Sequence, residues 1–398
     1  MKFGIDRLLN EPELRKPLAG RRVALLAHPA SLTRNLYHSL DALATLGELR
    51  LTAALGPQHG LRGDKQDNMV ESEDFNDPVH GIPVFSLYGE VRRPTTAMMD
   101  TFDVLLVDLQ DLGCRIYTFV TTLLYVLEAA AKSGKEVWIL DRPNPVGRPV
   151  EGLTLRPGCE SFVGAAPMPM RHGMTLGEMA RWFVATLRLD VDCQVIPMEG
   201  WLPDAAPGYG WPIGARTWVN PSPNAPNLWM ARCYPGSVML EGTTLSEGRG
   251  TTRPFEIVGA PFIDGVRLAR ELRHTRLPGF HARPLHFLPT FQKHANVPCG
   301  GVQIHVTDAR AFRPVATYLA LVALAHHQAP DAFRFRTERY EFVDDIPAFD
   351  LLTGDAEARE RIARGDSPLD VAESIATLRQ GERQVWERAR EAAFSLSL

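Results

Sequence analysis

Short aliphatic and β-branched runs alternate with helical patterns through the first 200 residues, and this alternation limits the available folds more than any other feature. A helical run covers 121–135, and Thr175 with Glu178 three residues later predicts a capping box at the start of another helix. Strands that alternate with helices predict an α/β fold whose mostly parallel sheet is covered on both faces. The predicted strands are RVALLAH (22–28), LTAAL (51–55), IPVFSL (82–87), DVLLVDL (103–109), EVWILD (136–141) and CQVIPM (193–198).

The pattern changes after residue 200, where Pro, Gly and Trp crowd a long irregular segment. Its three tryptophans favour an ordered connection over a disordered one; they are Trp201, Trp211 and Trp218. Beyond it, the sequence predicts a strand over 300–308, an Ala/Leu-rich helix over 312–327 and a charged tail helix with Ser367 as N-cap and Pro368 at its first position. We therefore predict a first domain over 1–230, including the connection of about 200–230, and a smaller C-terminal α/β domain over 231–398.

Charge and cysteine content exclude several functional classes. The formal net charge is −4, so the chain has no basic excess for binding nucleic acid. No apolar run reaches the length of a bilayer span, and the charged N-terminus has no secretory apolar region, so we expect a cytoplasmic protein without a membrane span. The five cysteines are dispersed without a CxxC pair, which favours reduced thiols over disulfides or a zinc site.

Polar clusters follow four of the predicted strands. Ligands bind at the carboxyl ends of the strands in open α/β sheets, so these clusters should meet in one cleft. A structural alternative exists for each: an aspartate after a strand can tie it to the next helix, and Asp141 with Arg142 can be a structural ion pair. The clusters supply His28, then Gln58, His59 and Arg62 in GPQHGLRGD, then Asp108, Asp111, Arg115 and Tyr117 in DLQDLGCRIYTF, and finally Asp141 and Asn144 in DRPNPVGRP.

The stretch EGTTLSEGRGTTRPFEIVGAPF (241–262) places Glu241, Glu247 and Arg249 among glycines. It is either a hairpin with solvated charges or a loop that presents carboxylates and a guanidinium to a ligand. Phosphate-binding glycine motifs, GxSxG and HExxH are all absent from the chain, which counts against nucleotide binding, serine esterase and zinc protease chemistry.

Eight stretches of the chain form a recognisable series: GPQHGLRGD, VFSLYGEVRRPT, VDLQDLGCRIYTF, LDRPNPVG, RHGMTLGE, WVNPSPNAPNL, EGTTLSEGRGTTRPFEIVGAPF and AFDLLTG. Together they resemble, in order, the NamZ-type exo-β-N-acetylmuramidases, formerly a domain of unknown function (DUF1343). The resemblance spans almost the whole chain and is most specific in EGTTLSEGRGTTRPFE. It implies a Rossmann-like N-terminal domain, a smaller C-terminal α/β domain and a cleft between them. It also implies removal of terminal N-acetylmuramic acid from the non-reducing end of peptidoglycan fragments, with no cofactor and no metal.

The loop GDKQDNMVESED departs from the usual family pattern, and so does the stretch just before it, where this chain has Pro57-Gln58-His59-Gly60 and the family usually reads Pro-Glu-His-Gly. That glutamate is the family's leading candidate for a catalytic carboxylate, and an amide can neither donate a proton as a general acid nor act as the nucleophile. Three explanations are open: another carboxylate acts, the substrate's own acetamido group assists, or the protein binds the sugar without cleaving it. The third is a non-catalytic amino-sugar-binding protein, and hydrolysis of a different bond is a weaker alternative.

We expect Glu241 or Glu247 as general acid and Asp108 or Asp111 as its partner, with Glu71, Glu73 and Asp64 as candidates beside Gln58. A planar guanidinium suits the lactyl carboxylate of a muramyl sugar, and the arginines expected there are Arg62, Arg115, Arg171 and Arg249. His59 and His172 are expected at sugar hydroxyls, and Gln58 or Asn144 at the acetamido group. Tyr117, Asp141 and Asn224 complete the expected substrate contacts, and a tryptophan of 201–229 is expected to stack on a sugar ring.

Overall fold

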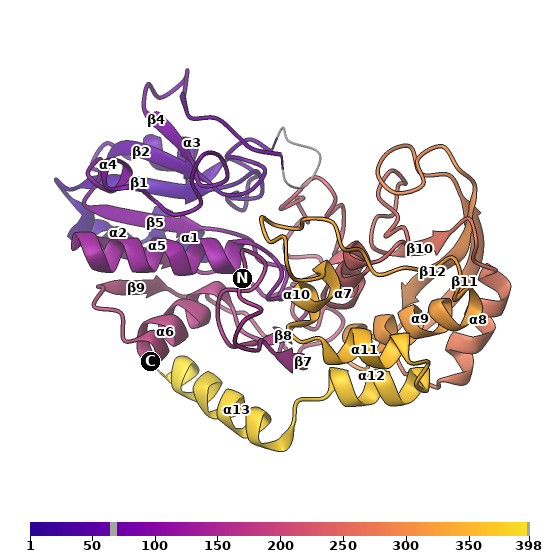
Figure 1. Ribbon diagram of the computed structural model, residues 1–398. Coiled ribbons are helices and arrows are strands. Elements are labelled where there is room, and N and C mark those ends of the chain that lie inside the picture. Colours follow the sequence, from indigo (N-terminus) through magenta and orange to yellow (C-terminus); the bar gives the residue numbers. More distant parts are fainter. Residues whose placement is uncertain (64–69, 396–398) are drawn as a thin grey trace.

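The computed structural model describes residues 1–63 and 70–395, and its first half is built on a seven-stranded sheet (Figure 1). The strand order is β3-β4-β2-β1-β5-β6-β9, and every neighbouring pair is parallel except β3 with β4. Each of the six predicted strands overlaps an observed one, which confirms the predicted α/β sheet. The strands are β1 (Arg22–Ala27), β2 (Arg50–Gly56), β3 (Phe75–Asn76), β4 (Pro83–Ser86), β5 (Val104–Asp108), β6 (Glu136–Leu140) and β9 (Cys193–Ile196).

Side chains of the central strands alternate between two buried layers. Val23 and Leu25 of β1 pack on one face with α1 (Gly4–Asn10) and α3 (Ser39–Ala44). Ala24 and Leu26 of β1 pack on the other face with α5 (Phe119–Ser133) and α6 (Leu176–Leu187). Because both faces are covered, the central strands are mostly apolar, as is typical of parallel sheets.

The second half is organised around a three-stranded antiparallel sheet in the order β10-β12-β11, seen on the right of Figure 1. The predicted strand over 300–308 is β12, and the predicted helix over 312–327 is α9 (Pro314–Gln328). The strands are β10 (Ile257–Ala260), β11 (Phe280–Phe287) and β12 (Cys299–Val306), and a separate pair is β7 (Glu151–Thr154) with β8 (Pro169–Arg171). The remaining helices are α2 (Pro12–Arg15), η1 (Lys16–Leu18), α4 (Thr96–Met99), α7 (Leu228–Ser237), η2 (Val238–Gly242), α8 (Gly265–His274), α10 (Ala348–Thr353) and α11 (Glu357–Ala363).

The segment between β9 and α7 is irregular and ordered, as its tryptophans predicted. The Trp211 and Trp218 rings lie 4.9 Å apart between their centroids, and Trp211 also packs on Phe3. Trp201 Nε1 donates to the carbonyl of Gly210 at 2.8 Å. These contacts anchor the connection on the first half of the molecule.

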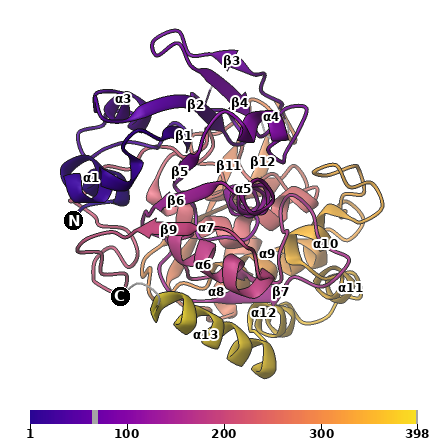
Figure 2. The same ribbon diagram turned by 90° about the vertical axis from the view of Figure 1, so that its left-hand side faces the viewer.

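The charged tail forms two helices instead of the single one predicted. Ser367 and Pro368 begin α12 (Pro368–Ala376) as expected, but a second helix, α13 (Gln380–Ser395), follows. Figures 1 and 2 both show α13 beside α6, so the end of the chain returns to the first half. Among the described residues, none of the helices combines the length and the apolarity that crossing a bilayer requires.

Candidate active site

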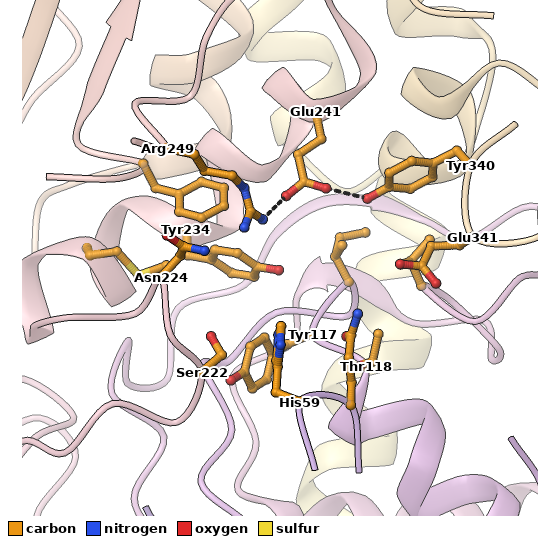
Figure 3. A pocket seen from close by; sticks show the side chains of 15 residues that line it. His59, Tyr117, Thr118, Ser222, Asn224, Tyr234, Glu241, Arg249, Tyr340 and Glu341 are labelled. Carbon is orange, nitrogen blue, oxygen red and sulfur yellow. Dashed lines mark hydrogen bonds and ion pairs between the residues drawn. The ribbon is translucent and has the colours of Figure 1, made fainter. Parts of the chain in front are cut away.

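A cavity lies where the loops after β2 and β5 meet the second half of the chain (Figure 3). The loop after β2 contributes Gln58 and His59, and the segment before α5 contributes Tyr117 and Thr118. The cavity's other polar and aromatic residues come from later in the chain and are Ser222, Asn224, Tyr234, Glu241, Arg249, Phe255, Tyr340 and Glu341.

Glu241 extends from η2 into this cavity, with its side chain buried. Arg249 Nη2 donates to Glu241 Oε1 at 2.6 Å, and the Tyr340 hydroxyl donates to Oε2 at 2.6 Å. Burial opposes the charge of Arg249, but the attraction of Glu241 and Glu247 outweighs this effect and raises the pKa of the guanidinium. The ion pair therefore places an ionised carboxylate in the cavity.

Glu341 is the second carboxyl group that lines the cavity, and it is buried as well. The Tyr88 hydroxyl donates to Glu341 Oε2 at 3.1 Å. Burial raises the pKa of Glu341 to about 7, and the nearby negative charge of Glu241 acts in the same direction. Within the described part of the chain, Glu341 has no ion-pair partner comparable to Arg249, and its carboxyl group is partly protonated near neutral pH.

The loop after β2 presents Gln58 in a fixed orientation. Thr118 Oγ1 donates to Gln58 Oε1 at 2.7 Å, and both side chains are buried. With the amide oxygen bound to Thr118, the amide NH₂ is the group that Gln58 offers to a ligand. Gln58 therefore serves as a hydrogen-bond donor in this arrangement.

Three residues of the cavity adopt backbone conformations that side chains other than glycine rarely take. The φ angles are 70° at His59, 64° at Phe255 and 44° at Glu341. Such conformations cost about 1–3 kcal/mol each and cluster at active sites and ligand-binding loops. Their concentration around one cavity favours this cavity as the functional site.

Six of the sequence-predicted site residues line this cavity, namely Gln58, His59, Tyr117, Asn224, Glu241 and Arg249. Burial raises the pKa of the Tyr117 phenol, which keeps it a neutral hydrogen-bonding group. None of the three tryptophans of the connection lines the cavity among the described residues. The structure instead places Trp211 and Trp218 in the packing around Phe3.

Glu247 is not among the residues that line the cavity, but it contacts Arg249, which does. Its carboxylate is 3.2 Å from Arg249 Nε and 2.8 Å from Lys293 Nζ. Burial alone would raise the pKa of Glu247, but Lys293 and Arg249 outweigh it and hold the pKa below its ordinary value. This ionised carboxylate orients the guanidinium that contacts Glu241.

Two of the predicted site aspartates, Asp108 and Asp111, are buried outside the cavity and bond to other residues there. Arg142 binds both oxygens of Asp108, at 2.6 and 2.9 Å, so Arg142 pairs with Asp108 and not with Asp141. Asp111 Oδ2 accepts from the backbone N–H of Gly113 at 2.7 Å and lies 3.2 Å from His172 Nε2. These contacts tie strand ends to neighbouring loops.

Four further candidates also make structural contacts away from the cavity. Asp141 accepts from Thr175 and from the N–H of Gly177 at the start of α6. Asn144 bonds to the backbone of Val146 and Met174, and Arg171 pairs with Glu151 at 3.0 Å. Arg115 donates to the carbonyls of Leu153, Met168 and Leu352.

The remaining candidates near Gln58 line a separate hollow. Arg62 pairs with Asp77 at 2.9 Å, Glu71 pairs with Arg92 at 3.0 Å, and Glu73 is exposed. Asp64 lies outside the described residues. Within the part of the chain that the structure describes, no three His, Cys, Asp or Glu side chains gather as a metal site would require.

Comparisons with known proteins agree on one family. Residues 23–229 match the model of the N-terminal part of exo-β-N-acetylmuramidase NamZ, and residues 232–394 match its C-terminal part. The chain belongs to the NamZ family. The peptidoglycan β-N-acetylmuramidase NamZ of Bacillus subtilis (strain 168) is 40% identical over 375 residues, which cover 94% of this chain and 87% of that protein.

Two solved structures extend this agreement to the fold. A DUF1343 family protein from Bacteroides fragilis NCTC 9343 superposes with a TM-score of 0.86 at 31% identity, covering 98% of each chain. A second DUF1343 family protein from the same organism gives a TM-score of 0.73 at 27% identity, again over 98% of each chain. The NamZ resemblance seen in the sequence is therefore confirmed, and the comparisons give no support to the non-catalytic alternative.

Several residues of this NamZ cavity were not predicted, above all Tyr340 and Glu341. They lie in RYEFVDD, a charged stretch that looks like an exposed loop, and the positive φ of Glu341 has no signature in the sequence. Tyr234 was missed because a tyrosine inside an apolar helix is indistinguishable from a core residue. The proximity of Ser222 to the predicted Asn224 was the one usable signal.

Proposed function

We propose that this protein is an exo-acting β-N-acetylmuramidase that removes the terminal non-reducing N-acetylmuramic acid from peptidoglycan fragments, with the cavity of Figure 3 as its active site. The observation that carries the proposal is the ionised Glu241, held by Arg249 and Tyr340 inside a cavity that both halves of the chain line. Glycoside hydrolysis places a carboxylate beside the anomeric carbon, where positive charge develops in the transition state.

Among the four arginines considered for the lactyl carboxylate, Arg249 is the one that lines the cavity. Arg62, Arg115 and Arg171 bind other partners elsewhere in the structure. Gln58 and His59 are placed to hydrogen-bond the acetamido group and hydroxyls of the same sugar. In this proposal Gln58 positions the substrate, and the acid comes from another residue. Action in the cytoplasm, on imported fragments, stays a prediction from the sequence.

The decisive experiment is a mass-spectrometric time course on MurNAc-GlcNAc with the native protein and Gln58→Glu in parallel. We expect the native protein to release MurNAc. GlcNAc-GlcNAc, which has no lactyl carboxylate, should be cleaved far more slowly, and GlcNAc-MurNAc should stay intact because its MurNAc is at the reducing end. If the Gln58→Glu variant released MurNAc and the native protein did not, the proposal would be contradicted, because the native site would then lack its catalytic acid.

Binding without turnover has a distinct signature. A ligand that binds only the folded state raises the melting temperature whether or not it is consumed. If MurNAc-GlcNAc raised the Tm of the native protein and remained intact after prolonged incubation, the protein would be a sugar-binding member of the family.

A further inference from the structure

Gln58 leaves the cavity without a carboxyl group at the loop position where the family resemblance predicts one, yet the same cavity contains Glu341. This carboxyl group comes from the opposite end of the sequence, between α9 and α10. Figure 3 shows Glu341 among the side chains that line the cavity, together with Thr118, whose hydroxyl donates to the Gln58 amide oxygen. Glu341 therefore provides a carboxyl group to the same space that Gln58 lines.

The two carboxyl groups of the cavity have contrasting surroundings. Glu241 is bonded to a guanidinium at one oxygen and to a phenol at the other. Among the described residues, the side chain that bonds to Glu341 is the Tyr88 phenol, and the Arg92 guanidinium lies over the neighbouring Phe342 ring, 3.9 Å from the ring centroid. Environments that separate two carboxyl groups in this way assign one as the ionised group and the other as the acid.

We propose that Glu341 is the general acid of the glycosidase reaction and that Glu241 is its ionised partner; this inference rests on the function proposed above. The Glu341 carboxyl group protonates the glycosidic oxygen while the bond from that oxygen to the anomeric carbon breaks, with both electrons staying on the oxygen. A water molecule bonds to the anomeric carbon and releases one proton to Glu241. Proton exchange with solvent then returns both groups to their starting forms.

Several groups face Glu341 and set its protonation. Tyr88 and Arg92 come from the segment after β4, Glu241 comes from η2, and Tyr340 is the preceding residue, while His59 lines the same cavity. Burial raises the pKa of Glu341 to about 7, whereas Tyr88 and Arg92 lower it. Since the acid form is the active one, the rate should fall as the pH rises through this value.

The test compares Glu341→Gln with Glu338→Gln, a matched control three residues away that is exposed and outside the cavity. On MurNAc-GlcNAc, whose leaving group needs a proton, Glu341→Gln should lower kcat by about 10²- to 10⁴-fold. On 4-nitrophenyl β-N-acetylmuramide, whose leaving group departs without protonation, the loss should be less than about tenfold. The control should match the native protein on both substrates.

A second variant tests the inference even if Glu341→Gln folds poorly. Tyr88→Phe keeps the buried ring and removes the hydroxyl that stabilises the ionised form of Glu341. The alkaline limb of the kcat profile should therefore move to higher pH by about half a unit to one unit.

Failure of this inference differs from failure of the proposed function. If the native protein cleaves neither substrate, the proposed function is wrong. If the native protein cleaves both substrates and Glu341→Gln lowers kcat by the same factor on both, Glu341 is not the general acid. The same conclusion follows if the alkaline limb of the kcat profile stays at the native pH in Tyr88→Phe.

Discussion

At the scale of single residues, arginines that look equivalent in the sequence have different partners in the structure. Arg115 is 1% exposed and bonds to three backbone carbonyls, and burial lowers its pKa to about 10. Arg249 instead contacts two carboxylates and lines the cavity. Both follow motifs that indicate ligand binding, so residue type alone does not separate a structural guanidinium from a substrate contact.

Replacing Arg115 should therefore affect stability and leave substrate affinity unchanged. Arg115→Met removes the donors of three buried carbonyls, and each unsatisfied group costs about 1–3 kcal/mol, so we expect a loss of at least about 3 kcal/mol in the free energy of unfolding. Urea denaturation followed by circular dichroism measures this loss.

The matched control is Arg310→Met, which changes an exposed arginine. It should leave both the free energy of unfolding and KM as in the native protein. KM for MurNAc-GlcNAc should be unchanged in the folded Arg115→Met protein. A KM raised tenfold with native stability would assign Arg115 to the substrate and contradict its structural role.

At the scale of elements, the start of α6 shows how one capping site joins two parts of the fold. Thr175 and Glu178 form the predicted capping box, and Asp141 at the end of β6 adds two hydrogen bonds to the same turn. Burial, together with the charge of Glu178, raises the pKa of Asp141 to about 7. The helix start therefore carries a carboxyl group that titrates near neutral pH.

This carboxyl group should make stability depend on pH in a defined direction. Between about pH 4 and pH 7 the folded state holds a proton on Asp141 that the unfolded state has released, so stability falls as the pH rises through this window. Asp141→Asn lacks this titration. Relative to the native protein, its free energy of unfolding should increase by about 2–4 kcal/mol between pH 4.5 and pH 7.5.

Denaturant unfolding of both proteins at the two pH values provides the measurement. Asp190→Asn, an exposed change just after the same helix, is the control and should follow the native pH dependence. A constant difference between Asp141→Asn and the native protein at the two pH values would show that Asp141 keeps an ordinary pKa in the folded state.

Elements that depend on local pattern were predictable, whereas those that depend on distant partners were not. The buried strands β1, β5 and β6 are continuous apolar runs, and α6 and α12 have N-cap signals, so the sequence located all five. β11 alternates half-buried and exposed residues and contains a proline, which weakens its strand signal. The two-residue β3 has no pattern of its own, because pairing with β4 defines it.

At the scale of the whole molecule, the expectation that ligands bind at the carboxyl ends of the strands located part of the site and left the rest undetermined. It brought Gln58, His59 and Tyr117 to one cavity, because β2 and β5 end at the same edge of the sheet. It also predicted Asp108 and Asp141 as site residues, but their side chains bond to Arg142 and to the N–H of Gly177. The opposite wall with Glu341 depends on how the second half of the chain folds back, which no local pattern specifies.

The return of α13 to the first half of the chain also depends on contacts between residues that lie far apart in the sequence. Trp386 of α13 is 4% exposed, its Nε1 donates to the carbonyl of His172 at 3.1 Å, and its ring lies 5.0 Å from that of Trp182 in α6. Trp386→Ala would leave a large cavity between α13 and α6, so we expect a loss of about 3–5 kcal/mol in the free energy of unfolding.

Val385→Ala is the matched control, because this neighbouring side chain on the same helix is 69% exposed and should be replaceable without loss. Both variants should keep native kcat and KM at low temperature, since neither residue lines the cavity. The measurement is the urea concentration at the unfolding midpoint of each variant, compared with that of the native protein. Equal midpoints for Trp386→Ala and the native protein would mean that the contact between α13 and α6 does not hold the two ends of the fold together in solution.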